Sequence, residues 1–161
     1  MSPEDISFRM WQVEQCELKA VREALRQADS GRLVPHSTVK QLFKSRHIPN
    51  APVVLRCEMS EAAKIKWSDA VIGRLRSTWE YFDRCSGGID LREGFLGRIF
   101  STIEVICKHP NIGRSGRVRG TREWYSGEGS LIVYRELFGE IQVLGVLVTH
   151  RKWPRMKTAN A

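Results

Sequence analysis

The feature that most constrains this fold lies in residues 112–154, where a basic, glycine-rich loop is followed by strand-forming runs. The loop holds four arginines within nine residues, and three glycines that suit tight turns: Arg114, Arg117, Arg119, Arg122, Gly113, Gly116 and Gly120. Residues 131–137 and 141–149 are rich in apolar and β-branched side chains, and the breaks between these strands are short enough for antiparallel hairpins. The sequence therefore predicts three successive strands with fixed positive charge beside them.

A strand and two helices are predicted before this region. Residues 64–67 alternate as a short strand, Ser68 and Asp69 form a helix cap, and residues 70–84 have a helical apolar period. A second helix is expected over residues 91–109, where Pro110 ends it. The order β-α-α-β-β-β predicts an α+β fold in which a two-helix hairpin packs on a small, twisted antiparallel sheet.

The last predicted strand is apolar on both sides, so each face of the sheet needs a cover. A regular alternation would place Ile141, Val143, Gly145 and Leu147 on one side and Gln142, Leu144, Val146 and Val148 on the other. The helix pair can cover one face. The other face requires a further element.

Residues 1–48 are the candidate for that cover. They predict helices at residues 8–29 and 38–46, with Gly31 as a stop and Ser37 as an N-cap. Their covering apolar side chains are Val13, Val21, Leu25, Val39, Leu42 and Phe43. Two helices of this size bury too little surface to fold alone, so we expect them to dock on this chain or on a partner. Residues 49–58 contain two prolines and are expected to form a linker.

Charge and composition indicate which partners and which cellular compartment to expect. The chain has 161 residues, a net charge of +8 and a pI near 9.7, which point to a polyanionic partner or an acidic protein. From Met59 onward, 17 Lys and Arg face 11 Asp and Glu, so this part carries +6 of the +8. No apolar run approaches the ~20 residues of a membrane span. Without a signal peptide and with four dispersed cysteines, a reduced cytoplasmic protein is expected.

Several motifs together resemble a known family. These are Pro110-Asn111-Ile112-Gly113-Arg114, Gly116-Arg117-Val118, Gly120-Thr121-Arg122-Glu123, Leu131-Ile132-Val133-Tyr134-Arg135 and Trp153-Pro154. With the upstream helix pair, residues 64–154 are similar to the RelE/ParE superfamily of bacterial type II toxins. Residues 23–39, which include Glu23-Ala24-Leu25 and Val34-Pro35-His36, look like the C-terminal tail of the matching antitoxins. The resemblance implies an antitoxin-tail-like segment (1–48), a linker (49–58) and a toxin domain (59–161).

For an RNA-cleaving member, arginines would bind phosphate and stabilise the charge that builds as a 2′-hydroxyl attacks. The candidate catalytic residues are Arg117, Arg122, Arg135 and His150, and the candidate nucleic-acid-binding residues are Arg114, Arg117, Arg119, Arg151 and Lys152. The alternatives are a solvated loop with surface ion pairs, an Arg135 paired with Glu123 or Glu136, and an ordinary strand-end His150.

Other titratable residues have weaker claims. The chain lacks the tyrosine or His-Tyr pair that some family members carry near this end, and Tyr134 or Tyr125 could substitute, although a strand tyrosine usually packs. Glu123 is expected to be a carboxylate held by its arginine neighbours. The histidines His36, His47 and His109 are interpreted as capping or surface residues. No ligand spacing predicts a metal, and no cofactor is expected.

Three functions remain open at this point. The resemblance implies either a metal-independent, ribosome-dependent mRNA endonuclease or a ParE-like, non-enzymatic inhibitor of DNA gyrase. The third possibility is a silenced toxin whose basic face is covered by residues 8–48, acting in cis or on a neighbouring chain. None of the three involves a membrane.

Overall fold

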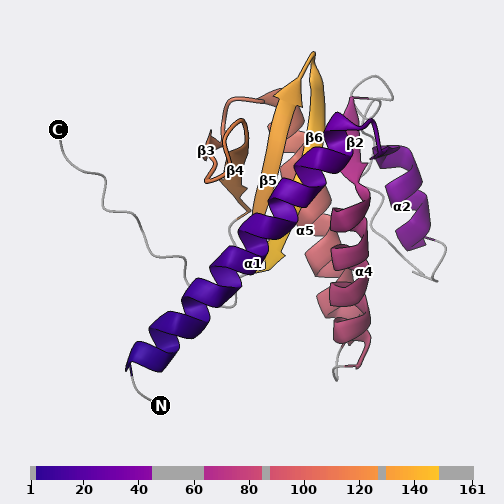
Figure 1. The fold of residues 1–161 in the computed structure, drawn as a ribbon. Helices are drawn as coiled ribbons and strands as arrows, with labels where there is room; N and C mark the ends of the chain where they lie inside the picture. The colour runs from indigo at the N-terminus through magenta and orange to yellow at the C-terminus, as the bar shows by residue number, and fades with distance from the viewer. Residues whose placement is uncertain (1–2, 45–63, 85–87, 127–129, 149–161) are drawn as a thin grey trace.

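The computed structural model describes residues 3–44, 64–84, 88–126 and 130–148, which form an α+β fold (Figure 1). The helices are α1 (Pro3–Asp29), α2 (His36–Lys44), α4 (Asp69–Arg84) and α5 (Gly88–Lys108). The strands are β1 (Leu33–Pro35), β2 (Ile65–Ser68), β3 (Arg114–Ser115), β4 (Arg122–Tyr125), β5 (Ser130–Leu137) and β6 (Glu140–Val148). The expected linker at residues 49–58 lies outside these ranges.

The strands form one sheet in the order β1-β2-β6-β5-β4-β3. Strands β4, β5 and β6 pair antiparallel, as predicted, and β3 adds a short antiparallel pairing with β4 inside the expected loop. Strand β2 runs parallel to β6, so the expected all-antiparallel sheet is wrong at this position. The chain leaves β2 through α4 and α5 before it returns, and such a crossover permits parallel pairing. Strand β1 adds an antiparallel edge beside β2 that the sequence did not predict.

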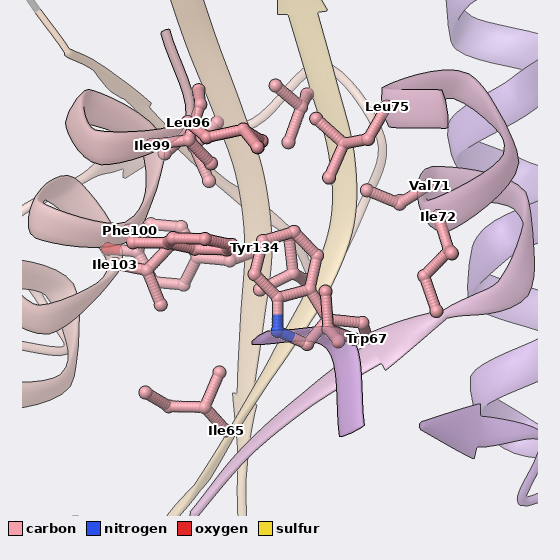
Figure 2. Packing of buried hydrophobic residues seen from close by; sticks show 14 of the residues in the cluster. Ile65, Trp67, Val71, Ile72, Leu75, Leu96, Ile99, Phe100, Ile103 and Tyr134 are labelled. Atoms are coloured by element: carbon pink, nitrogen blue, oxygen red, sulfur yellow. The ribbon is translucent and has the colours of Figure 1, made fainter. Parts of the chain in front are cut away.

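One face of the sheet packs against α4 and α5. Figure 2 shows Trp67 of β2 and Tyr134 of β5 between apolar side chains of the two helices. The cluster includes Ile65, Val71, Leu75, Phe95, Ile99, Phe100, Ile103, Ile132 and Val143, all buried. Helix α2 joins the same cluster through Val39 and Phe43, and the Phe43 and Trp79 rings lie 5.7 Å apart.

Helix α1 covers the opposite face, crossing in front of β5 and β6 in Figure 1. A separate cluster forms there from Val21, Ala24, Ala28, Val118, Leu131, Val133, Leu144 and Leu147. The second face of the sheet is therefore covered within the same chain.

A β-bulge changes the expected alternation of β6. The register shifts between Val133 and Tyr134, whose partners are Gly145 and Val143, so Leu144 is the extra residue. Beyond the bulge, Leu147 packs in the α1 cluster and Val146 in the other, the reverse of the predicted faces. At Gly145, an added Cβ would lie 3.2 Å from side-chain carbons of Val133 and Val21. The glycine therefore lets α1 approach the sheet closely.

Polar contacts define the ends of the helices. Ser68 Oγ accepts the Val71 N–H at 3.4 Å and caps α4, as predicted. The neighbouring Ala70 N–H bonds to Gln27 Oε1 of α1 at 3.2 Å. Gly31, with φ of 74°, stops α1 as predicted. The expected cap at Ser37 is wrong, because α2 already begins one residue earlier, at His36.

Candidate nucleic-acid interface

The basic loop is organised around Glu123 of β4, whose side chain is 5% exposed. Its Oε2 accepts bonds of 3.3 and 3.0 Å from Nε and Nη2 of Arg114. Its Oε1 accepts the backbone N–H of Arg117 at 3.1 Å, while the Arg117 Nε lies 4.0 Å away. Glu123 is thus the carboxylate that holds the loop, in agreement with the expected role, and these contacts leave it no part as a base.

Arg122 points to the other face of the sheet. Its register partner is Tyr134, which belongs to the cluster under α4 and α5, and its Nη1 donates to the Gly113 carbonyl at 2.8 Å. Adjacent strand residues point to opposite faces, so Arg122 and Glu123 are separated by the sheet itself. The structure therefore does not bring Arg122 together with Arg117.

Tyr134 is fully buried, and its hydroxyl forms two hydrogen bonds to backbone groups. It donates to the Pro110 carbonyl at 2.8 Å and accepts the Gly113 N–H at 3.0 Å. Burial raises the pKa of Tyr134, partly offset by the Gly113 bond and by the charge of Arg122. The side chain anchors the start of the basic loop, and the idea that it substitutes for a catalytic tyrosine is wrong.

Arg135 lies on the α1 face of β5, with its side chain 14% exposed. Its Nε donates to Gln142 Oε1 at 2.8 Å, and its Nη1 lies 2.8 Å from Oδ1 of Asp29, the last residue of α1. The expected partners Glu123 and Glu136 are wrong, because Glu123 binds Arg114 and Glu136 accepts the Gly139 N–H. The partner comes from the leading helix, about a hundred residues away in sequence.

Helix α1 also approaches Arg117. A small cavity of ≈10 Å³ separates the helix from the sheet, and it is lined by Glu17, Leu18, Val21, Arg117, Val118, Glu123, Val133 and Leu147. Glu17 of α1 thus lines the same cavity as Arg117, while Asp29 at the end of α1 is paired with Arg135. Arg119, by contrast, is exposed.

Most of the described residues that were expected to cover the sheet are buried or pack against a buried cluster, but one is exposed. Val21, Val39 and Phe43 are buried, and Leu25 packs against the α1 cluster. The expectation fails for Leu42, which is 43% exposed because it turns to the outer side of α2. Val13 belongs to α1, but its side chain is not among those described. His150, Arg151 and Lys152 also lie outside the described residues.

His36 was missed as a docking residue. It is fully buried, its Nδ1 accepts the Trp67 Nε1–H at 2.9 Å, and its ring lies 5.4 Å from that of Phe100. Its interpretation as a capping or surface residue is therefore wrong. The available signal was its spacing, since His36, Val39 and Phe43 fall on one stripe of α2.

Within the described ranges, no group of three His, Cys, Asp or Glu side chains could hold a metal ion. None of the helices described is both long and apolar enough to cross a bilayer.

Comparisons with known proteins indicate a toxin-like relationship. No protein-family model matches the chain. The chain is 24% identical over 93 residues to "Putative toxin Y4kP" of Sinorhizobium fredii (strain NBRC 101917 / NGR234). The match covers 58% of this chain but 95% of the relative. A toxin-sized unit therefore constitutes nearly the whole relative, and the rest of this chain has no counterpart in it.

Proposed function

We propose that this chain is the toxin of a bacterial type II toxin–antitoxin system, joined to the segment that neutralises it. The toxin part would be residues 59–161, and residues 1–48 would be the antitoxin-like part. Three observations support this division: the size of the matched relative, the separate apolar cluster under α1, and the basic excess after residue 58.

The contact between Asp29 and Arg135 carries the proposal. An arginine on a sheet face is suited to bind phosphate, but here the Nη1 of the guanidinium is paired with a carboxylate of the leading segment. Tethering makes such docking intramolecular, at an effective concentration of order mM for a short flexible linker. The segment would then exclude a polyanionic target without any separate antitoxin chain.

The proposed activity is metal-independent cleavage of mRNA on the ribosome. Arg117 and Arg135 would contact the phosphate backbone on the α1 face, and His150 would move the proton. Arg122 would support the reaction indirectly, through the loop carbonyl it binds. The cell compartment consistent with this target is the cytoplasm.

The experiment compares growth and transcript integrity after induction of three proteins: the intact chain, the chain without residues 1–58, and the full chain with Val21→Asp. Val21 is 3% exposed beneath α1, so a buried carboxylate there should release the helix. Lys19→Asp, on the exposed side of α1, is the matched control. We expect growth arrest and cleaved transcripts with the deletion and with Val21→Asp, but not with the intact chain or Lys19→Asp. Equal growth with all four proteins would contradict neutralisation in cis.

One observation favours a second target. Arg117, Arg122 and Arg135 do not converge, since Arg122 lies on the opposite face, and Tyr134 is unavailable for proton transfer. A ParE-like inhibitor of DNA gyrase needs no such set of side chains. A supercoiling assay with the released chain separates the two targets. Arrest with intact transcripts and inhibited supercoiling would favour gyrase.

A further inference from the structure

We propose that the turn between β5 and β6 is a protein-recognition knob, which inserts Phe138 into an apolar pocket with a basic rim on a partner protein. Phe138 combines two properties that bring the fold no benefit, a nearly complete exposure and a strained backbone. The knob uses neither the basic loop nor α1, so it stands apart from the proposed function.

Exposure is the first property. Phe138 is 96% exposed, more than any other large apolar side chain in the described ranges, and its neighbour Leu137 is 37% exposed. Figure 1 shows this turn at the far end of the β5–β6 hairpin, beyond the end of α1. A single exposed apolar side chain is ordinary on a protein surface, so exposure alone does not mark a site.

The backbone of the turn is the second property. Phe138 has φ of 52° and Gly139 has φ of 77°, and two positive φ angles in succession are those of a two-residue type I′ hairpin. Asn-Gly, Asp-Gly or Gly-Gly suit such a turn, whereas a bulky residue with positive φ is an outlier, and no other non-glycine residue of the described part has one. Strain of this kind is concentrated at binding and active sites, where the side chain has a use that offsets its cost to folding.

The knob is also rigid. Leu137 pairs with Glu140 across the hairpin, and the Gly139 N–H bonds to Glu136 Oε1 at 3.2 Å. A side chain displayed on an ordered turn loses little conformational entropy on binding, and a phenyl ring offers a large apolar area. These are the properties of an anchor residue at the centre of a protein interface.

The charges around the knob favour a protein partner over a polyanion. Residues 136–140 hold two carboxylates and no lysine or arginine, although the chain as a whole carries +8. Glu140 is paired with Lys66, whose Nζ lies 2.7 Å from its Oε1, and Glu136 is exposed. A nucleic acid or an anionic membrane surface would be repelled here, and one phenylalanine beside one leucine anchors poorly in a bilayer.

A second copy of the chain fits less well than a different protein. Two knobs meeting tip to tip would bury far less than the ~1,200 Å² of a stable interface. A knob entering any other face of a second copy would build open chains of molecules rather than a closed dimer. The partner is therefore a different protein, with an apolar pocket sized for one ring and lysine or arginine at the rim opposite Glu136.

The test places the photocrosslinker p-benzoylphenylalanine at position 138 of the full chain, in a lysate of the organism that makes it. We expect one adduct, with a protein other than this chain. An excess of about tenfold of the wild-type chain should lower the adduct yield by about the same factor, and the same excess of Phe138→Asn should leave it unchanged. The crosslinker at Arg76, an exposed position of α4, is the control and should give no such adduct.

The substitution Glu136→Gln tests the basic rim. The amide oxygen can still accept the Gly139 N–H, so the variant keeps the turn and removes the charge. The adduct yield should fall several-fold at low salt and less at high salt, where the charge of the wild type is screened. Glu23→Gln, at an exposed carboxylate of α1, is the matched control and should keep the wild-type yield.

Thermal unfolding separates recognition from a structural role. Phe138→Asn places a favoured residue in the turn, so its melting temperature should exceed that of the wild type by about 2–4 °C. An equal or lower melting temperature would make Phe138 a folding residue and overturn the inference. So would the absence of an adduct, an adduct with nucleic acid, lipid or a second copy of this chain, or equal competition by Phe138→Asn.

Discussion

Trp67 donates a hydrogen bond of 2.9 Å from Nε1 to Nδ1 of His36, and the two ring planes are nearly parallel, with centroids 5.7 Å apart. This contact joins the first residue of α2 to β2, the strand next to the sheet edge, and both residues are fully buried. It requires neutral histidine, because a protonated Nδ1 would carry a donor toward the indole N–H. Burial, with a smaller effect of Lys40, lowers the pKa of His36 to about 4.

The docking of α2 should therefore weaken in acid. In the unfolded chain His36 titrates near 6.5, and in the folded chain near 4, so the unfolded state binds more protons between these values. Stability should fall as the pH drops from 6.5 to about 4, by about 3 kcal/mol in total for this group. Urea unfolding at several pH values measures the slope.

His36→Gln provides the control for the other titrating groups, because glutamine can accept the indole N–H but does not titrate. Lys40 and Glu104, whose Nζ and Oε1 atoms lie 3.9 Å apart, face the same region and are unchanged in the variant. The wild type should lose more unfolding free energy in acid than His36→Gln, so the difference between the two proteins should narrow as the pH falls. If the unfolding free energies of both proteins fell equally with pH, the acid effect would not come from His36.

Gly145→Ala should weaken the contact between α1 and the sheet. The new Cβ would lie 3.2 Å from carbons of both Val133 and Val21, and stiff, buried valines cannot move far. We expect a loss of about 1–3 kcal/mol and faster proteolysis within α1. The control is Gly97→Ala, at an exposed position of α5 where a Cβ meets nothing within 4 Å, and it should stabilise the chain by about 1 kcal/mol. Unchanged proteolysis of α1 in Gly145→Ala would show that the gap accommodates a methyl group.

Tyr134→Phe should free the start of the basic loop. The change leaves the buried Gly113 N–H without its acceptor and the Pro110 carbonyl without its donor. We expect a loss of about 1–3 kcal/mol, and faster hydrogen exchange at the Gly113 amide than in the wild type. Thr102→Ala removes a hydroxyl that bonds only within its own helix and should change stability by about 0.5 kcal/mol or less. Wild-type protection of Gly113 in Tyr134→Phe would mean that another group holds the loop.

Elements with a long period or a clear boundary could be predicted from the sequence. Helices α4 and α5, the hairpin of β5 and β6, and the cap at Ser68 depend on neighbours in the chain. The spacing of apolar residues also indicated that a second cover was needed on the sheet. These features are local, so the sequence carries their signal directly.

Features that depend on distant partners could not be predicted. The three residues of β1 show no period and are ordered by pairing with β2. Nothing near Arg135 in the sequence indicates Asp29 as its partner, and nothing near Leu144 indicates a bulge. Arg122 and Arg117 share a loop in the sequence, but strand alternation in β4 separates their faces. Each of these outcomes is set by tertiary packing.

Glu123→Gln should loosen the basic loop without changing its shape. A neutral amide can still accept the Arg117 N–H, but it loses the charge that attracts the Arg114 guanidinium. Because the Arg114 side chain is 42% exposed, we expect a moderate loss of about 1–2 kcal/mol. Trypsin should then cut faster after Arg114 and Arg117. Glu136→Gln, at an exposed carboxylate that bonds the Gly139 N–H, is the control and should be cut at the wild-type rate. Equal cleavage of Glu123→Gln and the control would show that Glu123 does not hold the loop.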